Sequence, residues 1–523
     1  MFAPIRTTRP DLSPTQELLH AQRSPARSGV VPPRSRTGYL LAGVLLLSLA
    51  ARVVGLDEQS LSMDEITEIS IAQRSLSSIL VAPDGFPPLY NLALHVWSSV
   101  FPGDLAARWL SVILGVLSVG IVWATARQVG DERTALWCAL IVALSPFHIW
   151  HSQEARAYIL YYLFAALSLY WFFVALRTNS ARAWTCYAAA AWGGLLCHYY
   201  FGLLVLTNLC VLLVEWRSLA PRHRMLIAHA ALAVASLPIL WLLHGDLSVE
   251  GAVPFPNRVN PAALGYTLFS FLAGYAIGPS TRELHGMSAG QAIPQVLPWV
   301  VVTGAAAGIL LLHGFRVLSP GRWSQRLILL TLLPVFGAAG AAAALGLTFQ
   351  VRHVLWASIP LMLLLGAGAT EIYRRRAAIG SALLAMLLLF AISRYHRHSL
   401  PRYKNEDTRA LAVYLRAQDD VSPIFVSSGY MAKPIRHYLG DASRVHPIPN
   451  ILPDGANLAE ALQTVEVKAP PDAPFWLAYT REFHGDPQGR FLQAFMRRYP
   501  VAGQASFPGV TLYRVGHASA ALR

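Results

Sequence analysis

Long apolar runs recur along most of the chain and are separated by short polar segments. Eleven of these runs are long enough to cross about 30 Å of hydrocarbon as helices. They lie near residues 39–56, 105–126, 134–150, 158–176, 184–200, 201–216, 225–244, 294–313, 327–347, 354–373 and 377–393. The pattern predicts an all-α membrane domain with about eleven transmembrane helices.

The first run also has a feature of a cleavable leader, because Ser48-Leu49-Ala50 resembles a signal-peptidase site. A long arginine-rich leader is unusual, so the interpretation favoured here is an uncleaved first helix. Two further stretches, 86–101 and 261–278, are only moderately apolar. Counting either as a full span would invert the arginine pattern that follows, and both are therefore predicted to be interfacial or re-entrant helices.

Arginines indicate the orientation of the spans. They gather in alternate connecting segments, at residues 6–36, 127–133, 177–182, 217–224, 316–326 and 374–376. The intervening loops hold few: Arg74, Arg156, Arg258, Arg282 and Arg352. Positive residues favour the cytoplasmic side. The sequence thus predicts a cytoplasmic N-terminus and an extracytoplasmic C-terminus.

Three domains are expected from the changes in composition. Residues 1–37 are rich in Pro, Ser and Arg and predict a disordered cytoplasmic tail. Residues 38–398 form the membrane domain. Residues 399–523 predict a small soluble α/β domain, because helical and strand-like patterns alternate there. Helices are expected at 405–418, 430–439 and 491–499, and strands at 423–427, 475–479 and 510–515.

Composition supports a membrane protein and excludes one class of partner. Hydrophobic residues make up 54% of the chain, charged residues only 13%, and the mean hydropathy is +0.43. The net charge of +14 is spread over short clusters without interleaved aromatics, so no nucleic-acid partner is expected. All four cysteines lie within apolar runs and are interpreted as packing residues.

The first candidate for chemistry is the pair Asp64 and Glu65 in Ser62-Met63-Asp64-Glu65, shortly after the first run. Neighbouring residues on a helix point in different directions, so one carboxylate can face a cavity while the other caps the helix or binds an arginine. A solvated helix cap is the plainer reading of the same residues.

The second candidate is the segment from His151 to Arg156, on the same side of the membrane as Asp64. Glu154 is compatible with a second acid, a metal ligand or an ion-pair partner of Arg156. His151, Arg156 and Tyr158 are candidate substrate-binding residues around it.

The third candidate is Arg352 with His353, at the outer end of the run that starts near residue 354. A guanidinium there suits a phosphate on a lipid whose tail lies alongside, although snorkelling to headgroups explains it equally. Pro88 and Tyr90, in Phe86-Pro87-Pro88-Leu89-Tyr90, lie in a stiff bend that positions a loop. With Arg352 and His353, they are further candidate substrate-binding residues.

The order of these motifs resembles the GT-C membrane glycosyltransferases: an outer Asp-Glu, Pro-Pro-Leu-Tyr, Gln-Glu-Ala-Arg and a late Arg-His before a span with Pro360. Within that group the chain looks like the bacterial branch of protein O-mannosyltransferases, lipid A aminoarabinose transferases and rhizobial lipopolysaccharide galacturonosyltransferases. The resemblance covers roughly residues 39–400. His353 departs from it, because an aromatic is common at that position.

The resemblance implies a polyprenyl-phosphate sugar as donor, Asp64 as catalytic base, Glu65 beside it, Glu154 as the second acid and Arg352 at the donor phosphate. Transfer with inversion is expected, to a lipid, glycan or protein acceptor of the cell envelope on the outer face of a bacterial inner membrane. A divalent Mg or Mn ion held by Asp64 and Glu154 is the second choice, and no compact metal motif is present. The loop from Gly245 to Asn260 is expected to cover the cavity.

Two other classes compete with a single-sugar transferase. A lipid-linked sugar transporter or flippase also has many spans, but the chain has no evident inverted repeat and its acids lie in outer loops. A glycan ligase would take a whole glycan from lipid pyrophosphate, and the identity of the donor would distinguish it.

Overall fold

A computed structural model describes residues 34–81, 86–217, 219, 221–248, 261–345, 349–380, 382, 389, 400–418, 421–452, 454–469 and 473–516. The predicted tail at 1–37, the expected covering loop from Gly245 to Asn260 and the eleventh run at 377–393 lie wholly or largely outside these residues. The chain divides into two compact units. The first is Met1–Leu40, of which only the start of α2 is described, and the second is Leu41–Arg523.

Helices account for most of the described residues before residue 376. In chain order they are α2 (Arg34–Val53), α3 (Met63–Ala72), α4 (Leu76–Val81), α5 (Leu89–Val100), α6 (Asp104–Val129), α7 (Glu132–Leu144), α8 (Pro146–Ser152), α9 (Tyr158–Thr178), α10 (Ala181–Leu195), α11 (Phe201–Val214), α12 (His223–Ala235), α13 (Leu237–Ser248), α14 (Pro261–Ala273), α15 (Thr281–Gly286), α16 (Ala289–Leu318), α17 (Trp323–Leu345), the 3₁₀ helix η1 (Val351–Ala357) and α18 (Ser358–Arg375).

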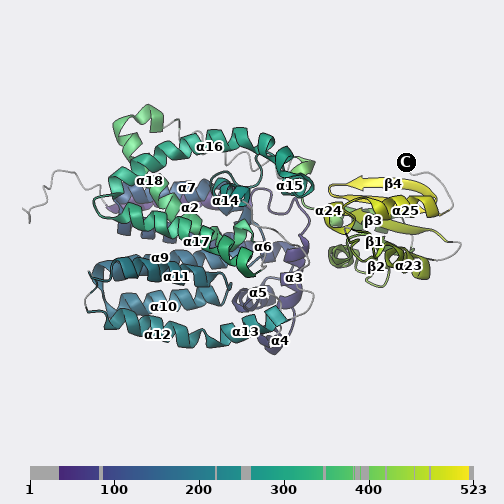
Figure 1. Ribbon diagram of the computed structural model, residues 1–523, viewed down its shortest axis with the longest axis horizontal. Coiled ribbons are helices and arrows are strands. Elements are labelled where there is room, and N and C mark those ends of the chain that lie inside the picture. Colours follow the sequence, from purple (N-terminus) through teal and green to yellow (C-terminus); the bar gives the residue numbers. More distant parts are fainter. Residues whose placement is uncertain are drawn as a thin grey trace, which may run out of the picture. The chain divides into compact units, whose positions relative to one another are not determined.

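Five helices in the described part of the chain are long and apolar enough to cross a membrane, or up to seven spans if each of two bent pairs counts as one. Shorter apolar helices start at Thr37, Phe201 and Ala262. The first ten predicted runs each fall on a helix or a broken pair of helices, with boundaries shifted by a few residues. Helices α6, α9, α10 and α12 pack in succession (Figure 1). The expected polytopic helical domain is confirmed.

The run at 134–150 is broken rather than continuous. Helix α7 ends at Leu144, and α8 starts at Pro146 after a bend of 60°. Pro146 has no N–H to continue the α7 ladder, whereas its fixed φ suits the first turn of a new helix. The Ser145 hydroxyl accepts from the His148 N–H and caps that turn. The break directs residues 146–157 across the bundle.

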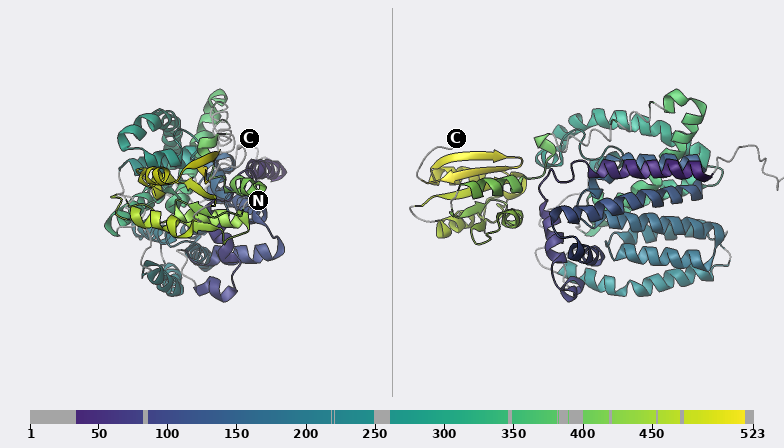
Figure 2. Two further views of the ribbon diagram at one scale, coloured as in Figure 1. Left: turned by 90° about the vertical axis from the view of Figure 1, so that its right-hand side faces the viewer. Right: turned by 180° about the vertical axis from the view of Figure 1, so that it is seen from behind.

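The two moderately apolar stretches form the short helices α5 and α14, of 12 and 13 residues. At about 1.5 Å per residue each extends less than about 20 Å, which is too short to cross a membrane alone. Helices α3, α4 and α5 gather at one end of the long helices (Figures 1 and 2). This agrees with interfacial helices in the first outer loop.

Glycines bring α16 and α18 into backbone contact. A Cβ at Gly314 of α16 would lie 2.0 Å from the Leu364 carbonyl oxygen, and one at Gly368 of α18 would lie 1.9 Å from that of Leu310. Close approach through small residues is the usual means of packing helices within lipid, where apolar surface gains little from leaving its surroundings. The α16–α18 contact therefore depends on these two positions.

The C-terminal part of the chain forms a five-stranded mixed sheet of order β2-β1-β3-β5-β4. The strands are β1 (Ile424–Val426), β2 (Val445–Pro447), β3 (Phe475–Thr480), β4 (Val501–Phe507) and β5 (Val510–Val515). Strand β1 pairs in parallel with β2 and β3, whereas β5 pairs antiparallel with β3 and β4. The predicted strands at 423–427, 475–479 and 510–515 are β1, β3 and β5.

Helices cover this sheet on both faces with two separate apolar clusters. They are η2 (Pro401–Tyr403), α21 (Thr408–Ala417), η3 (Gly429–Met431), α22 (Ala432–Leu439), α23 (Leu458–Lys468), α24 (Glu482–Gly485) and α25 (Arg490–Arg498). The three predicted helices correspond to α21, η3 with α22, and α25. The small α/β unit is confirmed, and β2, β4, α23 and α24 are additions to the predicted elements.

Gly314→Ala should lower the thermal midpoint of the protein in detergent, because the added methyl group forces α16 away from α18 at a cost of about 1–3 kcal/mol. Gly308→Ala on the same helix is the matched control, since a Cβ there meets nothing within 4 Å. The control should leave the midpoint unchanged or raise it, because alanine favours helix by about 1 kcal/mol over glycine. Equal midpoints for the two variants would contradict this account of the packing.

Candidate active site

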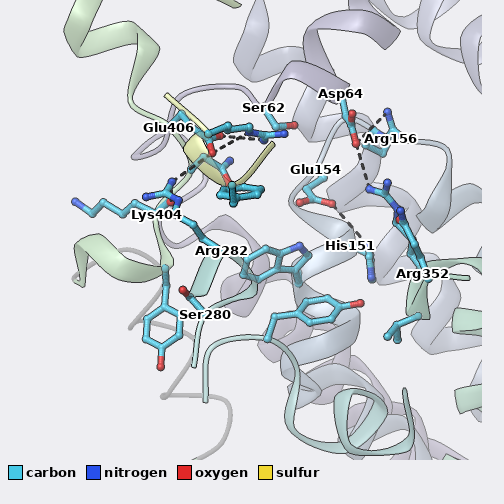
Figure 3. Close-up of a pocket in the computed structure, with 18 of the residues that line it drawn as sticks. Ser62, Asp64, His151, Glu154, Arg156, Ser280, Arg282, Arg352, Lys404 and Glu406 are labelled. Carbon is cyan, nitrogen blue, oxygen red and sulfur yellow. Dashed lines mark hydrogen bonds and ion pairs between the residues drawn. The ribbon is translucent and has the colours of Figure 1, made fainter. Parts of the chain in front are cut away.

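A cavity of about 490 Å³ brings together residues from the membrane helices and from the C-terminal domain. One end is lined by Asp64 of α3, by the segment after α8 and by η1, and the other by α15, the segment around η2 and the turn after β3. Figure 3 shows the two groups of charged side chains. The charged lining residues are Asp64, Glu154, Arg156, Arg282, Arg352, Arg402, Lys404, Glu406 and Arg481.

Asp64 lies between two guanidinium groups. Its Oδ2 is 3.1 Å from Nη1 of Arg352 and 3.6 Å from Nη1 of Arg156 (Figure 3). The side chain is 38% exposed, so it faces the cavity rather than the protein interior. The charge of Arg156, followed by that of Arg352, outweighs burial and holds the pKa of Asp64 well below its usual range. The group is a carboxylate at every physiological pH.

Glu65 points the other way and is buried. Its carboxylate accepts from Arg108 Nε at 2.8 Å and Nη2 at 3.1 Å, from the Ala155 N–H at 3.1 Å and from the Ser62 N–H at 2.8 Å. The Ser62 contact completes a capping box at the start of α3. Glu65 has 0% side-chain exposure and does not line the cavity. The geometry therefore favours a positioning role over the catalytic role expected from the sequence.

The segment after α8 supplies a second acid and a second cation. His151 Nδ1 lies 3.7 Å from Glu154 Oε2, and both side chains line the cavity. Arg156 contacts Asp64 and, at 3.6 Å, the buried Glu68. The Tyr158 ring lies 5.3 Å from the Arg156 guanidinium and 5.4 Å from that of Arg352. Cation–π contacts to one ring thus hold both guanidiniums beside Asp64.

Four predicted substrate-binding residues, His353, Tyr90, Pro88 and Tyr158, are absent from the cavity lining. The His353 ring stacks on Tyr200 at 4.5 Å. Tyr90 is buried, with its hydroxyl 3.4 Å from Ser111 Oγ, and Pro88 is buried at the start of α5. Tyr158 is buried, and its ring contacts the guanidiniums of Arg156 and Arg352. The structure thus brings together Asp64, His151, Glu154, Arg156 and Arg352.

Sequence reasoning missed the opposite end of the cavity. Arg282 was noted only as an outer-loop cation, and Lys404, Glu406 and Arg481 were not candidates. Glu406 accepts from Arg481 Nε and Nη2, both at 3.0 Å, and from Arg282 Nη2 at 3.3 Å. The run of charges near residue 404 was the available signal, but it was interpreted as the start of a soluble domain.

A buried polar network supports the loop that carries Glu154. Arg52 of α2 has 0% exposure and donates to the Ala143 carbonyl at 3.1 Å, near the end of α7. It also contacts Ser152 Oγ at 3.2 Å and His148 Nδ1 at 2.7 Å on α8. Arg52 therefore satisfies carbonyl groups left by the break between α7 and α8 and joins both helices to α2.

A divalent metal fits this arrangement poorly. Among the described residues, no group of three His, Cys, Asp or Glu side chains is placed to hold an ion. Asp64, the proposed ligand, is already neutralised by two arginines, which would repel a cation.

Glu65→Gln should destabilise the protein far more than Asp64→Asn. Removing one partner of a buried ion pair leaves Arg108 uncompensated, at a cost of about 3–5 kcal/mol, whereas Asp64 is partly exposed and solvent can screen its arginines. The thermal midpoints of both variants in detergent measure the difference. A larger loss for Asp64→Asn would show that Asp64 is the structural member of the pair.

Glu406 should make stability depend on pH on the acid side. Burial raises its pKa, but the charges of Arg481 and Arg282 outweigh burial and lower it below the usual 4.5. A lowered carboxyl pKa contributes stability above the usual value, and this contribution is lost as the pH falls through the folded-state pKa. The gap in thermal midpoint between wild type and Glu406→Gln should therefore shrink below about pH 4.5.

The exposed Glu460→Gln on α23 is the control for that experiment and should show no such gap at neutral pH. A gap between wild type and Glu406→Gln that stays constant down to pH 3 would contradict the role of the Glu406 charge.

Comparison with known proteins identifies the fold. Residues 86–241 match the family of dolichyl-phosphate-mannose-protein mannosyltransferases. The chain is similar to the crystal structure of ArnT from Cupriavidus metallidurans in the apo state, with 13% identity, a TM-score of 0.55 and coverage of 92% of this chain and 98% of that one. The crystal structure of the same protein bound to undecaprenyl phosphate matches with 13% identity, a TM-score of 0.52 and the same coverage.

No curated protein sequence matches the chain. The fold nevertheless agrees with the resemblance drawn from the motifs, and the matched segment contains those at Pro88 and Glu154. The chain is therefore a multi-pass membrane protein with the GT-C glycosyltransferase fold, and the predicted resemblance is confirmed.

Proposed function

We propose that the protein transfers a sugar from a polyprenyl-phosphate donor to an acceptor hydroxyl on a lipid, glycan or protein of the cell envelope. The observation that carries the proposal is the position of Asp64 on the cavity, between Arg352 and Arg156. A base for the acceptor and two cations for a phosphate leaving group are the parts this displacement requires. The binding of undecaprenyl phosphate by an enzyme of the same fold supports the choice of donor.

The reaction is a single displacement. The acceptor oxygen attacks the anomeric carbon and its proton passes to Asp64, while the bond between that carbon and the phosphate oxygen breaks and its electron pair stays on the phosphate. Arg352 and Arg156 stabilise the resulting charge by bidentate hydrogen bonds. Attack opposite the leaving group inverts the anomeric centre. His151 and Glu154 orient the sugar or the acceptor from the neighbouring wall.

The resting ion pairs impose an order on these steps. A carboxylate paired with two guanidiniums is a weak base, because both charges favour the ionised form. A donor phosphate competes for the same guanidiniums, and its binding releases Asp64 and raises the pKa of that group. The base therefore becomes effective only when a leaving group occupies the site.

The proposal also assigns the parts of the chain and their location. Residues 38–398 form the catalytic membrane domain, and residues 399–523 form an extracytoplasmic domain that closes one side of the cavity. The arginine pattern supports a cytoplasmic N-terminus in a bacterial inner membrane. Asp64, Arg156 and Arg352 carry the chemistry, with Tyr158 and Glu65 as positioning residues.

The proposal is tested by transfer or hydrolysis of a panel of radiolabelled polyprenyl-phosphate sugars with purified protein in lipid. One donor should be consumed, and Asp64→Asn should lower the rate by about 10²–10⁴-fold, the usual contribution of a general base. Arg352→Gln should raise the KM for the donor and lower kcat, because it removes a contact to the phosphate in both the ground state and the transition state.

Asp57→Asn is the matched control, since this carboxylate precedes α3, is 65% exposed and pairs with Arg409 away from the cavity lining. It should retain full activity. A folded Asp64→Asn variant with normal transfer would refute the assignment of the base. Translocation of lipid-linked sugar without any turnover would instead indicate a transporter.

A further inference from the structure

The cavity has a second group of cations beyond those assigned to the donor phosphate. Arg282 lies in the first turn of α15 and Lys404 follows η2 (Figure 3). Arg481 lies in the turn after β3 and also lines the cavity. Arg481 adopts the left-handed backbone conformation, with φ of 44° and ψ of 50°, which non-glycine residues rarely adopt. Its guanidinium donates from Nε and Nη2 to Glu406, and the residue lines the cavity.

The charges at this end do not balance. Arg282 and Arg481 share a single carboxylate, Glu406, whose side chain is only 8% exposed. Arg402 pairs with Glu283 at 2.7 Å. The Lys404 ammonium has no hydrogen bond or ion pair within the part of the chain that the structure describes. Four cations therefore face two carboxylates.

At the end of the cavity around Asp64, carboxylates outnumber arginines. Arg156 and Arg352 lie beside Asp64 and Glu68, and Glu154 pairs with His151, so that end has no excess of positive charge. A polyprenyl monophosphate sugar brings one phosphodiester, which the Asp64 end accommodates. It leaves the excess positive charge around Lys404 uncompensated.

We propose that the end formed by Arg282, Lys404 and Arg481 binds an anionic group, a phosphate or carboxylate, carried by the acceptor. The proposal rests on the proposed function, because displacement with inversion places the acceptor on the side of the anomeric carbon opposite the departing phosphate. The acceptor therefore extends away from Arg352, toward the second group of cations. Forked guanidinium donors and an unpaired ammonium suit an oxyanion more than a neutral glycan.

Binding of a sugar phosphate tests the site without requiring turnover. The protein is reconstituted in phosphatidylcholine vesicles and saturated with polyprenyl phosphate, which occupies the Arg352 end. Titration with glucose 6-phosphate, glucuronate and glucose then probes the other end by calorimetry. The two anions should bind and glucose should not, and added salt should weaken binding.

Lys404→Gln should weaken the binding of glucose 6-phosphate about tenfold, the value of one charge-assisted hydrogen bond. Lys468→Gln at the end of α23 is the matched control and should have no effect, because Lys468 is absent from the cavity lining. Lys404→Glu should abolish binding. Neither change at Lys404 removes a contact on which folding depends, so both variants should keep the wild-type thermal midpoint.

The outcomes distinguish a failure of the proposed function from a failure of the acceptor site alone. Failure to bind polyprenyl phosphate would refute the proposed function, whereas normal binding of that lipid with no affinity for either anion would refute only the acceptor site. Equal binding of glucose and its phosphate would also refute it. If vesicles containing phosphatidylglycerol displace glucose 6-phosphate, the cations hold a lipid headgroup and the assignment to an acceptor is overturned.

Discussion

The buried ion pair between Glu65 and Arg108 is the interaction on which the site depends. Arg108 also donates to the carbonyls of Leu56, Gln59 and Ser60, and Glu65 accepts from the Ala155 N–H. One pair of side chains therefore joins the loop before α3, the start of α6 and the loop that carries Glu154 and Arg156. Because Glu65 is fixed in this way, its neighbour Asp64 is directed into the cavity. Adjacent residues on one helix point in divergent directions, so a positioning residue and a candidate base can be neighbours in the sequence.

The hydrogen-bond network around Arg52 also supports the loop that carries Glu154, from deeper in the bundle. A bend of 60° leaves carbonyl groups of α7 without helical partners, and in hydrocarbon such groups cost several kcal/mol each unless they are satisfied. Arg52 satisfies them and contacts α8 as well. A broken helix is therefore tolerated at the position where the chain must turn toward the cavity. Gln153 adds a second connection, because its side-chain amide donates to the Arg52 and Val54 carbonyls.

The sequence predicted the parts of this structure that follow from periodicity and helix geometry. The apolar runs predicted the transmembrane helices, and the adjacency of Asp64 and Glu65 predicted that their side chains point in different directions. It did not predict which carboxylate would be buried, because that depends on Arg108, in a segment otherwise interpreted as a span. Strand β2 was missed because only the first of its three residues is buried, whereas all three of β1 are, and β4 because its side chains are mostly exposed. Arg481 could not be assigned to the cavity, because only the packing of the C-terminal domain brings the turn after β3 beside Glu406.

The two ends of the cavity share one motif, a carboxylate between two arginines, and burial decides what each does. Glu406 is 8% exposed and accepts three hydrogen bonds from its arginines, so exchanging them for a ligand would leave a buried charge unpaired. Asp64 is 38% exposed and accepts one hydrogen bond, at 3.1 Å, with the second guanidinium at 3.6 Å. Water can replace these contacts when a phosphate takes the guanidiniums. The looser pair can therefore open during a reaction cycle. The tighter group keeps Arg282 and Arg481 in place, and Glu406 neutralises only part of their positive charge.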